Sequence, residues 1–316
     1  MVFITETLVY LSFSLLMGTM LGYSILAERM PSFHVPKRWL LLSTVGVGLL
    51  SLGPALAIII NFTEEMSIWS AGQLVLLKFQ VGQVGLLIFL VSSLLFCIIY
   101  FYDLAKDRLQ AFLGLVLVLL LVVGQGAVSH AFGLQGYWGL TVHTLHFLGV
   151  IVWIGLLFIF GWFTNENADW QSILKWFTPI AVICVIVLIA AGYFTMDIVI
   201  KNDQETTTIF TQYGNSWLTD YGQALLIKHL LTVPLLLYAL MNGFIYRYHL
   251  SKDPSHRLQP WIKTESVLAL LVFAVTAFMG QQTPHTRGQT YLKRKVLPGC
   301  FRLCTEKRLP PKWLST

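Results

Sequence analysis

Eight apolar stretches, each long enough to cross a lipid bilayer, fill most of this 316-residue chain. A membrane-spanning helix needs about 20 mostly apolar residues, because its backbone polar groups find no water in hydrocarbon and must bond within the helix. Hydrophobic residues make up 56% of the chain and charged residues only 11%, a balance that excludes an ordinary soluble domain. The chain is therefore predicted to be an all-α membrane protein. Its eight expected transmembrane helices cover residues 7–27, 39–60, 73–101, 112–128, 142–163, 176–200, 224–246 and 265–284.

The chain also repeats itself weakly, which predicts two similar four-helix halves, residues 1–130 and 131–286. Since four is an even number, the two halves would have the same orientation in the membrane, related by an axis along its normal. Chance similarity between apolar segments is the alternative explanation. The matching segments are 72–78 with 222–228, 124–130 with 280–285, and Leu8, Tyr10, Leu11 and Gly18 with Leu145, Phe147, Leu148 and Gly155.

The distribution of Lys and Arg predicts how the helices are oriented, because short cytoplasmic loops carry an excess of these residues. The first, third, fifth and seventh loops contain ten of them, whereas the second, fourth and sixth contain only Lys201. This bias places both termini outside the cell. Residues 287–316 contradict the bias, because they hold eight Lys or Arg against one acidic residue, Glu306. This tail is translocated despite its charge, or a last segment is misread, or the tail is not native to the chain; the abrupt change of composition favours the last explanation.

Five of the eight histidines lie at or near the outer ends of predicted spans, whereas His34, His249 and His256 lie in basic inner loops as ordinary solvated residues. His143 and His146 are three residues apart and therefore share a helix face. His130 is expected to end the fourth span, and the segment 131–141 is short enough to keep it close to the other two. The five outer histidines are His130, His143, His146, His229 and His285.

Neutral imidazole binds copper, zinc and iron, and its borderline nitrogen suits Cu(II). Three histidines within 17 residues around a tight outer loop predict a metal site, and a belt of interfacial polar anchors is the competing interpretation. Lys228 is expected to extend toward the headgroups. Glu265 is expected to begin the last span, where an acidic residue stabilises the helix N-terminus. The basic charge belongs to the tail, so no nucleic-acid partner is expected.

At these residues the chain resembles the copper resistance protein D (CopD) family of bacterial inner-membrane proteins, from about Gly124 to Pro284. One position departs from the family pattern Trp-x-Gly-Gly, since Leu156 replaces the second glycine, a change that concerns helix packing. The similar stretches are Ser129-His130-Ala131, Thr141-Val142-His143-Thr144-Leu145-His146, Val152-Trp153-Ile154-Gly155, Thr219-Asp220-Tyr221-Gly222-Gln223 with Lys228, Lys263-Thr264-Glu265, and Thr283-Pro284.

The resemblance implies copper tolerance and copper uptake across the bacterial cytoplasmic membrane, with the copper ion and the lipid bilayer as partners and a periplasmic or extracellular copper-binding protein as a further one. His130, His143 and His146 would form the main metal site, with His229 and His285 beside it. The chain has no phosphate-loop motif, and no enzymatic activity is expected. The alternative function is a membrane b-type cytochrome that binds haem through outer histidines. A copper-linked assembly or sensor subunit without transport is a third reading.

Overall fold

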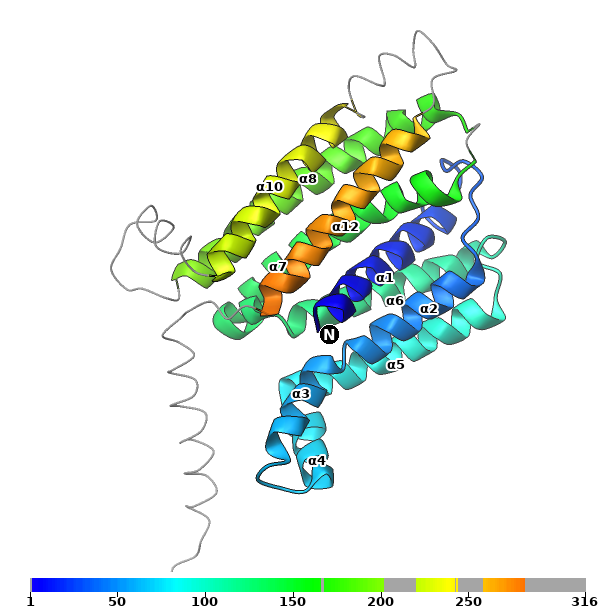
Figure 1. Cartoon of the computed structure of the whole chain (residues 1–316). Helices are drawn as coiled ribbons and strands as arrows, with labels where there is room; N and C mark the ends of the chain where they lie inside the picture. The colour runs from blue at the N-terminus through cyan, green and yellow to red at the C-terminus, as the bar shows by residue number, and fades with distance from the viewer. Residues whose placement is uncertain (1, 166–167, 202–219, 242, 244–257, 282–316) are drawn as a thin grey trace, which may run out of the picture.

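The computed structural model describes the chain except for residues 1, 166–167, 202–219, 242, 244–257 and 282–316. The described residues form a bundle of long, roughly aligned helices (Figure 1). Within the part of the chain that the structure describes, eight helical segments are long and apolar enough to cross a membrane, which confirms the all-α membrane fold. The helices are α1 (Val2–Tyr23), α2 (Lys37–Leu50), α3 (Gly53–Phe62), α4 (Ile68–Lys78), α5 (Gln80–Phe101), α6 (Arg108–Ala127), α7 (His130–Phe158), the π-helical turn η1 (Ile159–Phe163), α8 (Trp170–Lys201), α10 (Asp220–Leu240) and α12 (Gln259–Gln281).

The second predicted span is two helices, α2 and α3, separated at Ser51 and Leu52. Pro54 lies in the first turn of α3. Proline lacks a backbone N–H and disfavours the helical conformation in the residue before it, so it suits the start of a new helix better than the middle of an old one. The predicted span over 39–60 is confirmed as one apolar segment, Lys37–Phe62, which is interrupted at Ser51 and Leu52.

The third predicted span is also broken, because Phe79 is extended (φ −93°, ψ 136°) between α4 and α5. Ser67 begins α4, and its hydroxyl accepts a hydrogen bond from the Ser70 N–H. The pair α3–α4 folds back on itself around a small apolar core of its own and projects from the end of the bundle (Figure 1). The core residues of this pair are Ala55, Ile59, Ala71 and Val75.

The centre of the bundle is the crossing of α1 with α7. Helix α1 packs against α2, α6, α7 and α12, and α7 packs against α1, α6, α8 and α12. A Cβ atom added to Gly18 would lie 2.5 Å from the carbonyl of Gly155, closer than real Cβ contacts. The two backbones meet directly, as small residues allow in membranes, where association depends on close packing.

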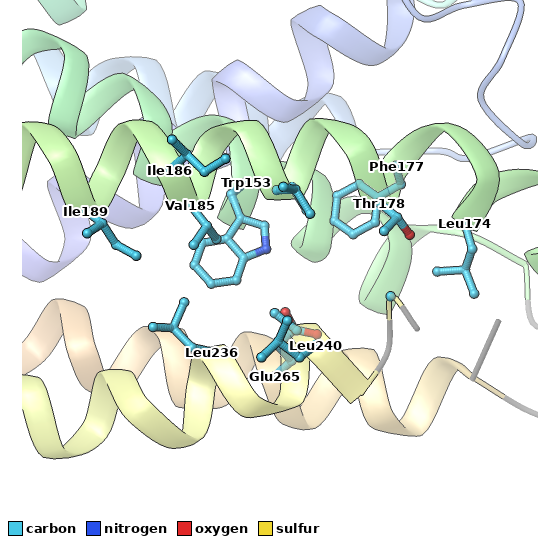
Figure 2. A pocket seen from close by; sticks show the side chains of 14 residues that line it. Trp153, Leu174, Phe177, Thr178, Val185, Ile186, Ile189, Leu236, Leu240 and Glu265 are labelled. Carbon is cyan, nitrogen blue, oxygen red and sulfur yellow. The ribbon is translucent and has the colours of Figure 1, made fainter. Parts of the chain in front are cut away.

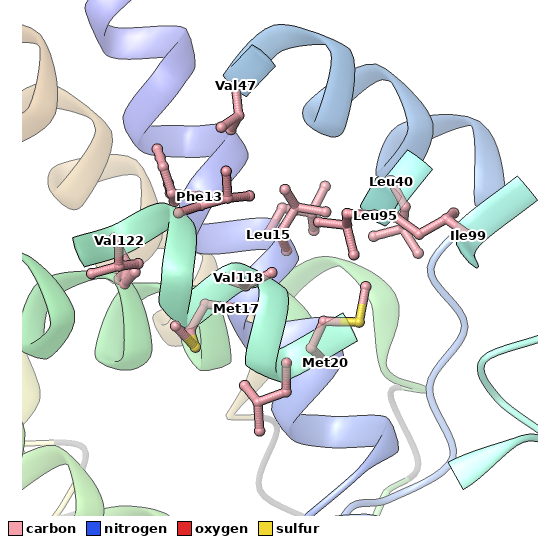
Figure 3. Close-up of a cluster of buried hydrophobic side chains, with 14 of the residues drawn as sticks. Phe13, Leu15, Met17, Met20, Leu40, Val47, Leu95, Ile99, Val118 and Val122 are labelled. Carbon is pink, nitrogen blue, oxygen red and sulfur yellow. The ribbon is translucent and has the colours of Figure 1, made fainter. Parts of the chain in front are cut away.

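Buried apolar side chains hold both halves to this crossing. Figure 3 shows the larger cluster, in which Phe13, Met17 and Met20 of α1 meet residues of α2, α5 and α6. A second cluster joins α7 to α8 and α12 around Trp153 and Phe177. The outward faces are apolar as well, so the surface of the bundle matches lipid rather than water. Examples of exposed residues on one such face are Leu87, Leu90 and Leu94 of α5.

At the end of the bundle opposite α3 and α4, polar contacts connect the loops. Phe33, between α1 and α2, pairs with Thr164, which follows η1, through an isolated antiparallel bridge. The Arg108 guanidinium donates to the Ser24 carbonyl and to the Glu28 carboxylate. The hydrogen bond from Arg108 to the Glu28 carboxylate holds the pKa of the Glu28 carboxyl below its ordinary value. The connections thus fix where α2, α6 and α8 enter the bundle.

The α1–α7 crossing gives a direct test of the packing. Gly18→Ala should lower the thermal unfolding temperature of the purified protein by several degrees, since overpacking typically costs about 1–3 kcal/mol. Gly72→Ala is the matched control, because a Cβ there meets nothing within 4 Å. Equal unfolding temperatures for the two variants would contradict a backbone contact at Gly18.

Candidate metal centre

His130 is the first residue of α7, and the prediction that it ends the preceding helix is wrong. Helix α6 ends at Ala127, and the Ser129 hydroxyl caps the new helix by accepting from the Phe132 N–H. The segment expected to be a connecting loop, 131–141, is mostly helical. Ser129 is a favoured N-cap residue, and this signal could have located the helix start.

The first turn of α7 is folded back by a break at Gln135 and Gly136. Gly136 has a positive φ of 54°, which glycine adopts without a steric penalty. A Cβ on Gly139 would collide with the backbone of Ala131, so the short first segment packs closely on the main helix. The backbone next to His130 therefore lies one turn before His143 on α7.

His146 is held against the neighbouring helix α8. Its Nδ1 lies 3.0 Å from the Leu188 carbonyl oxygen, and Gly192 leaves the space that the ring occupies. A Cβ on Gly192 would lie 3.0 Å from the Cε1 of His146. Because a carbonyl only accepts, Nδ1 carries the proton, and a neutral His146 keeps the lone pair of Nε2 free for a metal.

His229 has a similar arrangement on α10. Its Nδ1 lies 2.7 Å from the carbonyl of Leu225, one turn earlier on the same helix, and its side chain is exposed. A nitrogen bonded to a carbonyl in this way leaves the opposite ring nitrogen as the ligand. His143 is partly buried on α7 and is engaged in an interaction of its own.

The described side chains do not contain a group of three or more His, Cys, Asp or Glu arranged to hold a metal. The side chain of His130 and the whole of His285 lie outside the described residues, as do His249 and His256. The prediction of a site made by His130, His143 and His146 therefore stays a prediction. The structure places His143 and His146 on α7 and His229 on α10.

Two charges act on His146 from nearby. The Lys228 ammonium on α10 and the His143 imidazole both interact electrostatically with the His146 ring. Lys228 is partly buried, whereas Lys78, its counterpart by sequence at the end of α4, is exposed. A cation beside a metal ligand repels the metal, so Lys228 would oppose tight binding if His146 holds a metal.

A cavity of about 260 Å³ lies between α8 and α10, deeper in the bundle than the His146 contact (Figure 2). Its walls are mainly apolar and come from α8 and α10, with Trp153 of α7 and Glu265 of α12. Trp153 lies two helical turns beyond His146 and on the same face of α7, and Ile189 at the wall follows Leu188 directly. The cavity and the His146 contact are therefore neighbours along α8.

The prediction that Glu265 begins the last span is wrong. Helix α12 begins at Gln259, so Glu265 lies almost two turns inside the helix and cannot cap its N-terminus. The side chain is only 1% exposed and lines the cavity. An ionisable residue inside a membrane span is costly and commonly functional, and that signal was present in the sequence.

Comparison with known proteins gives one match. The model of the family copper resistance protein D, CopD, matches residues 171–279, which is 109 of the 316 residues. The CopD resemblance is thereby confirmed. The chain is a copper-related, multi-pass membrane protein, and the match spans α8, α10 and most of α12. No curated protein and no solved structure matches the chain.

The CopD match includes the Asp220 segment, Lys228, His229 and Glu265, and it begins after the histidines of α7. Its region is shorter than the resemblance that the motifs indicated, which began at about Gly124. The match concerns copper and lends no support to the alternative of a haem-binding cytochrome.

The charge next to His146 generates a prediction. Lys228→Met should tighten copper binding by about tenfold, equivalent to about 1.4 kcal/mol, because it removes a cation from the neighbourhood of the ligand. Copper titration of the detergent-purified protein measures the change, with Lys78→Met as the matched control at an exposed position. Weaker binding in the Lys228 variant would show that this lysine supports the site instead of opposing it.

Proposed function

We propose that this protein binds copper ions through histidines at one membrane face and conducts them across the bacterial cytoplasmic membrane. The metal ligands are His143 and His146, completed by His130, with His229 and His285 at the entrance. The observation that carries the proposal is the hydrogen bond from His146 Nδ1 to the Leu188 carbonyl. This contact orients the ring and presents Nε2, as second partners of metal-binding histidines do.

Copper suits this donor set. Imidazole nitrogen is a borderline ligand that binds Cu(II) well. Two histidines at positions i and i+3 of one helix present their rings on the same side. The back-folded first segment of α7 puts the backbone beside His130 near Gly139, one turn from His143. In this proposal the His130 ring faces the same side of α7 as His143 and His146.

The position of the cavity supports movement of the ion rather than storage. The His146 contact at Leu188 and the cavity wall at Ile189 are adjacent residues of α8. An ion released from the histidines would meet the cavity next, on the way to the opposite face. The absence of any phosphate-loop motif from the sequence fits movement driven by a gradient.

The loop charges support an orientation with both termini outside and the histidine face toward the periplasm. In this orientation the histidines would receive copper from outside, and a soluble copper-binding protein of the periplasm is the partner expected at that face. The proposed direction of copper movement is inward.

We also infer that residues 1–130 and 131–286 are two units related by an axis along the membrane normal. The aligned residues Gly18 and Gly155 approach each other, and the aligned rings of Tyr10 and Phe147 have centroids 5.8 Å apart. Equivalent residues meet in this way at a two-fold axis. The pairings of α1 with α2, α6 and α12 also recur as α7 with α8, α12 and α6.

The histidine ligands are tested by replacement. His143→Ala and His146→Ala should each remove one bound copper per chain and reduce copper accumulation in cells, with the protein still inserted. His34→Ala is the matched control, because His34 is exposed in the loop between α1 and α2. Metal analysis of the purified variants is the readout. Full copper content in both α7 variants would show that these histidines are interfacial polar anchors and not metal ligands.

The orientation is tested separately by labelling. In a cysteine-free background, a cysteine at Glu64, between α3 and α4, should react in intact cells with a thiol reagent that does not cross membranes. A cysteine at Lys106, between α5 and α6, should react only after the cells are opened. Both side chains are exposed, so accessibility within the protein is matched. The opposite pattern would move the histidines to the cytoplasmic face.

A further inference from the structure

The cavity between α8 and α10 contains polar atoms that its apolar walls leave without partners. Trp153 is 2% exposed and Thr178 is 8% exposed. Within the described residues, neither the Trp153 Nε1 nor the Thr178 Oγ1 has a hydrogen-bond partner. Both side chains line the cavity together with the Glu265 carboxyl (Figure 2). A buried N–H and a buried hydroxyl need partners, and the cavity is the place where a ligand could supply them.

Water is the ligand that fits these groups. It accepts from an indole N–H, donates to or accepts from a hydroxyl, and donates to a carboxylate. A volume of about 260 Å³ has room for about eight water molecules at ~30 Å³ each. Soft copper donors are missing from the described cavity lining, which contains no His, Cys or Met. The chemistry of the cavity therefore fits water and protons better than a second copper site.

The architecture does not require these polar groups. The register that pairs Gly18 with Gly155 also pairs Leu16 with Trp153, and the one that pairs Gly124 with Gly280 pairs Leu109 with Glu265. In the first half, α2 packs closely on α5. Among the described residues, the corresponding helices α8 and α10 make no comparable backbone contact, and the cavity lies between them. The second half differs from the first by an opened interface and a carboxyl group.

We infer that Glu265 is an intramembrane proton-binding site, which exchanges its proton with water in this cavity as copper passes the cavity. The coupling to copper rests on the proposed transport function. The carboxyl gives its proton to cavity water when the copper cation arrives, and the carboxylate offsets the charge of the ion in the low-dielectric interior. The proton leaves toward the side from which copper arrived. When the ion leaves on the opposite side, the carboxylate takes a proton from water on that side. Protons therefore move opposite to copper.

Other titratable groups that face α12 lie at different depths. Tyr10 of α1 contacts Phe273, and the Glu6 carboxylate lies near Gly280, at the histidine end of α12. Lys263 lies on α12 itself, with its ammonium over the Trp162 ring of η1. Among the described residues that line the cavity, Glu265 is the one titratable group. Glu6→Gln is thus a matched control, since it removes a carboxyl from another membrane span.

The first experiment measures the proton directly and does not depend on transport. Infrared difference spectra of the full-length protein in lipid are recorded while the pH is changed. The wild type and Glu6→Gln should show the C=O stretch of a protonated carboxyl appearing and disappearing reversibly, and Glu265→Gln should lose this signal. An unchanged signal in Glu265→Gln would overturn the inference.

The second experiment tests the coupling in proteoliposomes with copper outside and a pH-sensitive dye inside. Wild type and Glu6→Gln should take up copper and make the lumen more alkaline. Glu265→Gln should lose the pH change and transport at least tenfold more slowly. Copper uptake without a pH change, or with the same change in Glu265→Gln, would refute the coupling. If the wild type takes up no copper, the transport proposal fails, and the infrared spectra alone decide whether Glu265 binds a proton.

Discussion

The close approach of α1 and α7 at Gly18 and Gly155 is the contact on which the rest of the bundle depends. Without side chains at the crossing, the two helices touch through their backbones, and each can then contact three further helices. In a membrane, where burying apolar surface away from lipid gains little, such shape-dependent packing has to replace the hydrophobic effect. The crossing also fixes the rotation of α7 about its axis, and this rotation turns His146 and Trp153 toward α8.

At the interface of α7 with α8, polar side chains interrupt the apolar packing of the bundle. The positions that align by sequence with His146 and Trp153 hold buried apolar residues, Val9 and Leu16 of α1. The CopD match lies in the second half, around the cavity and Glu265.

The eight spans could be predicted from sequence because apolar length is a direct consequence of bilayer thickness. The break before Pro54 has a signal in the sequence, the proline itself. The break at Phe79 has none, because the apolar run looks alike on both sides of it. The fold-back before Gly139 was missed for a related reason, since Gly136 signals a turn without indicating its direction. The spacing of His143 and His146 predicted that both lie on one helix, as they do on α7, and their role as metal ligands stays a prediction.

The position of Glu265 was predicted wrongly for a different reason. Its position after Lys263 and Thr264 resembled a helix start, and only the first turn of α12 at Gln259 reveals that the carboxyl is inside the bundle. The hydrogen-bond partner of His146 could not be predicted either, because every residue of α8 has a backbone carbonyl. What the residues could indicate was the type of chemistry, and what they could not indicate was which helix supplies the second contact.

The central claim is that copper is held by imidazole nitrogens on α7, and X-ray absorption at the copper edge tests it most directly. The full-length protein in lipid, loaded with one equivalent of copper, should show nitrogen ligands with the outer-shell scattering pattern of imidazole rings. Coordination by sulfur alone, or by oxygen without imidazole scattering, would contradict the account.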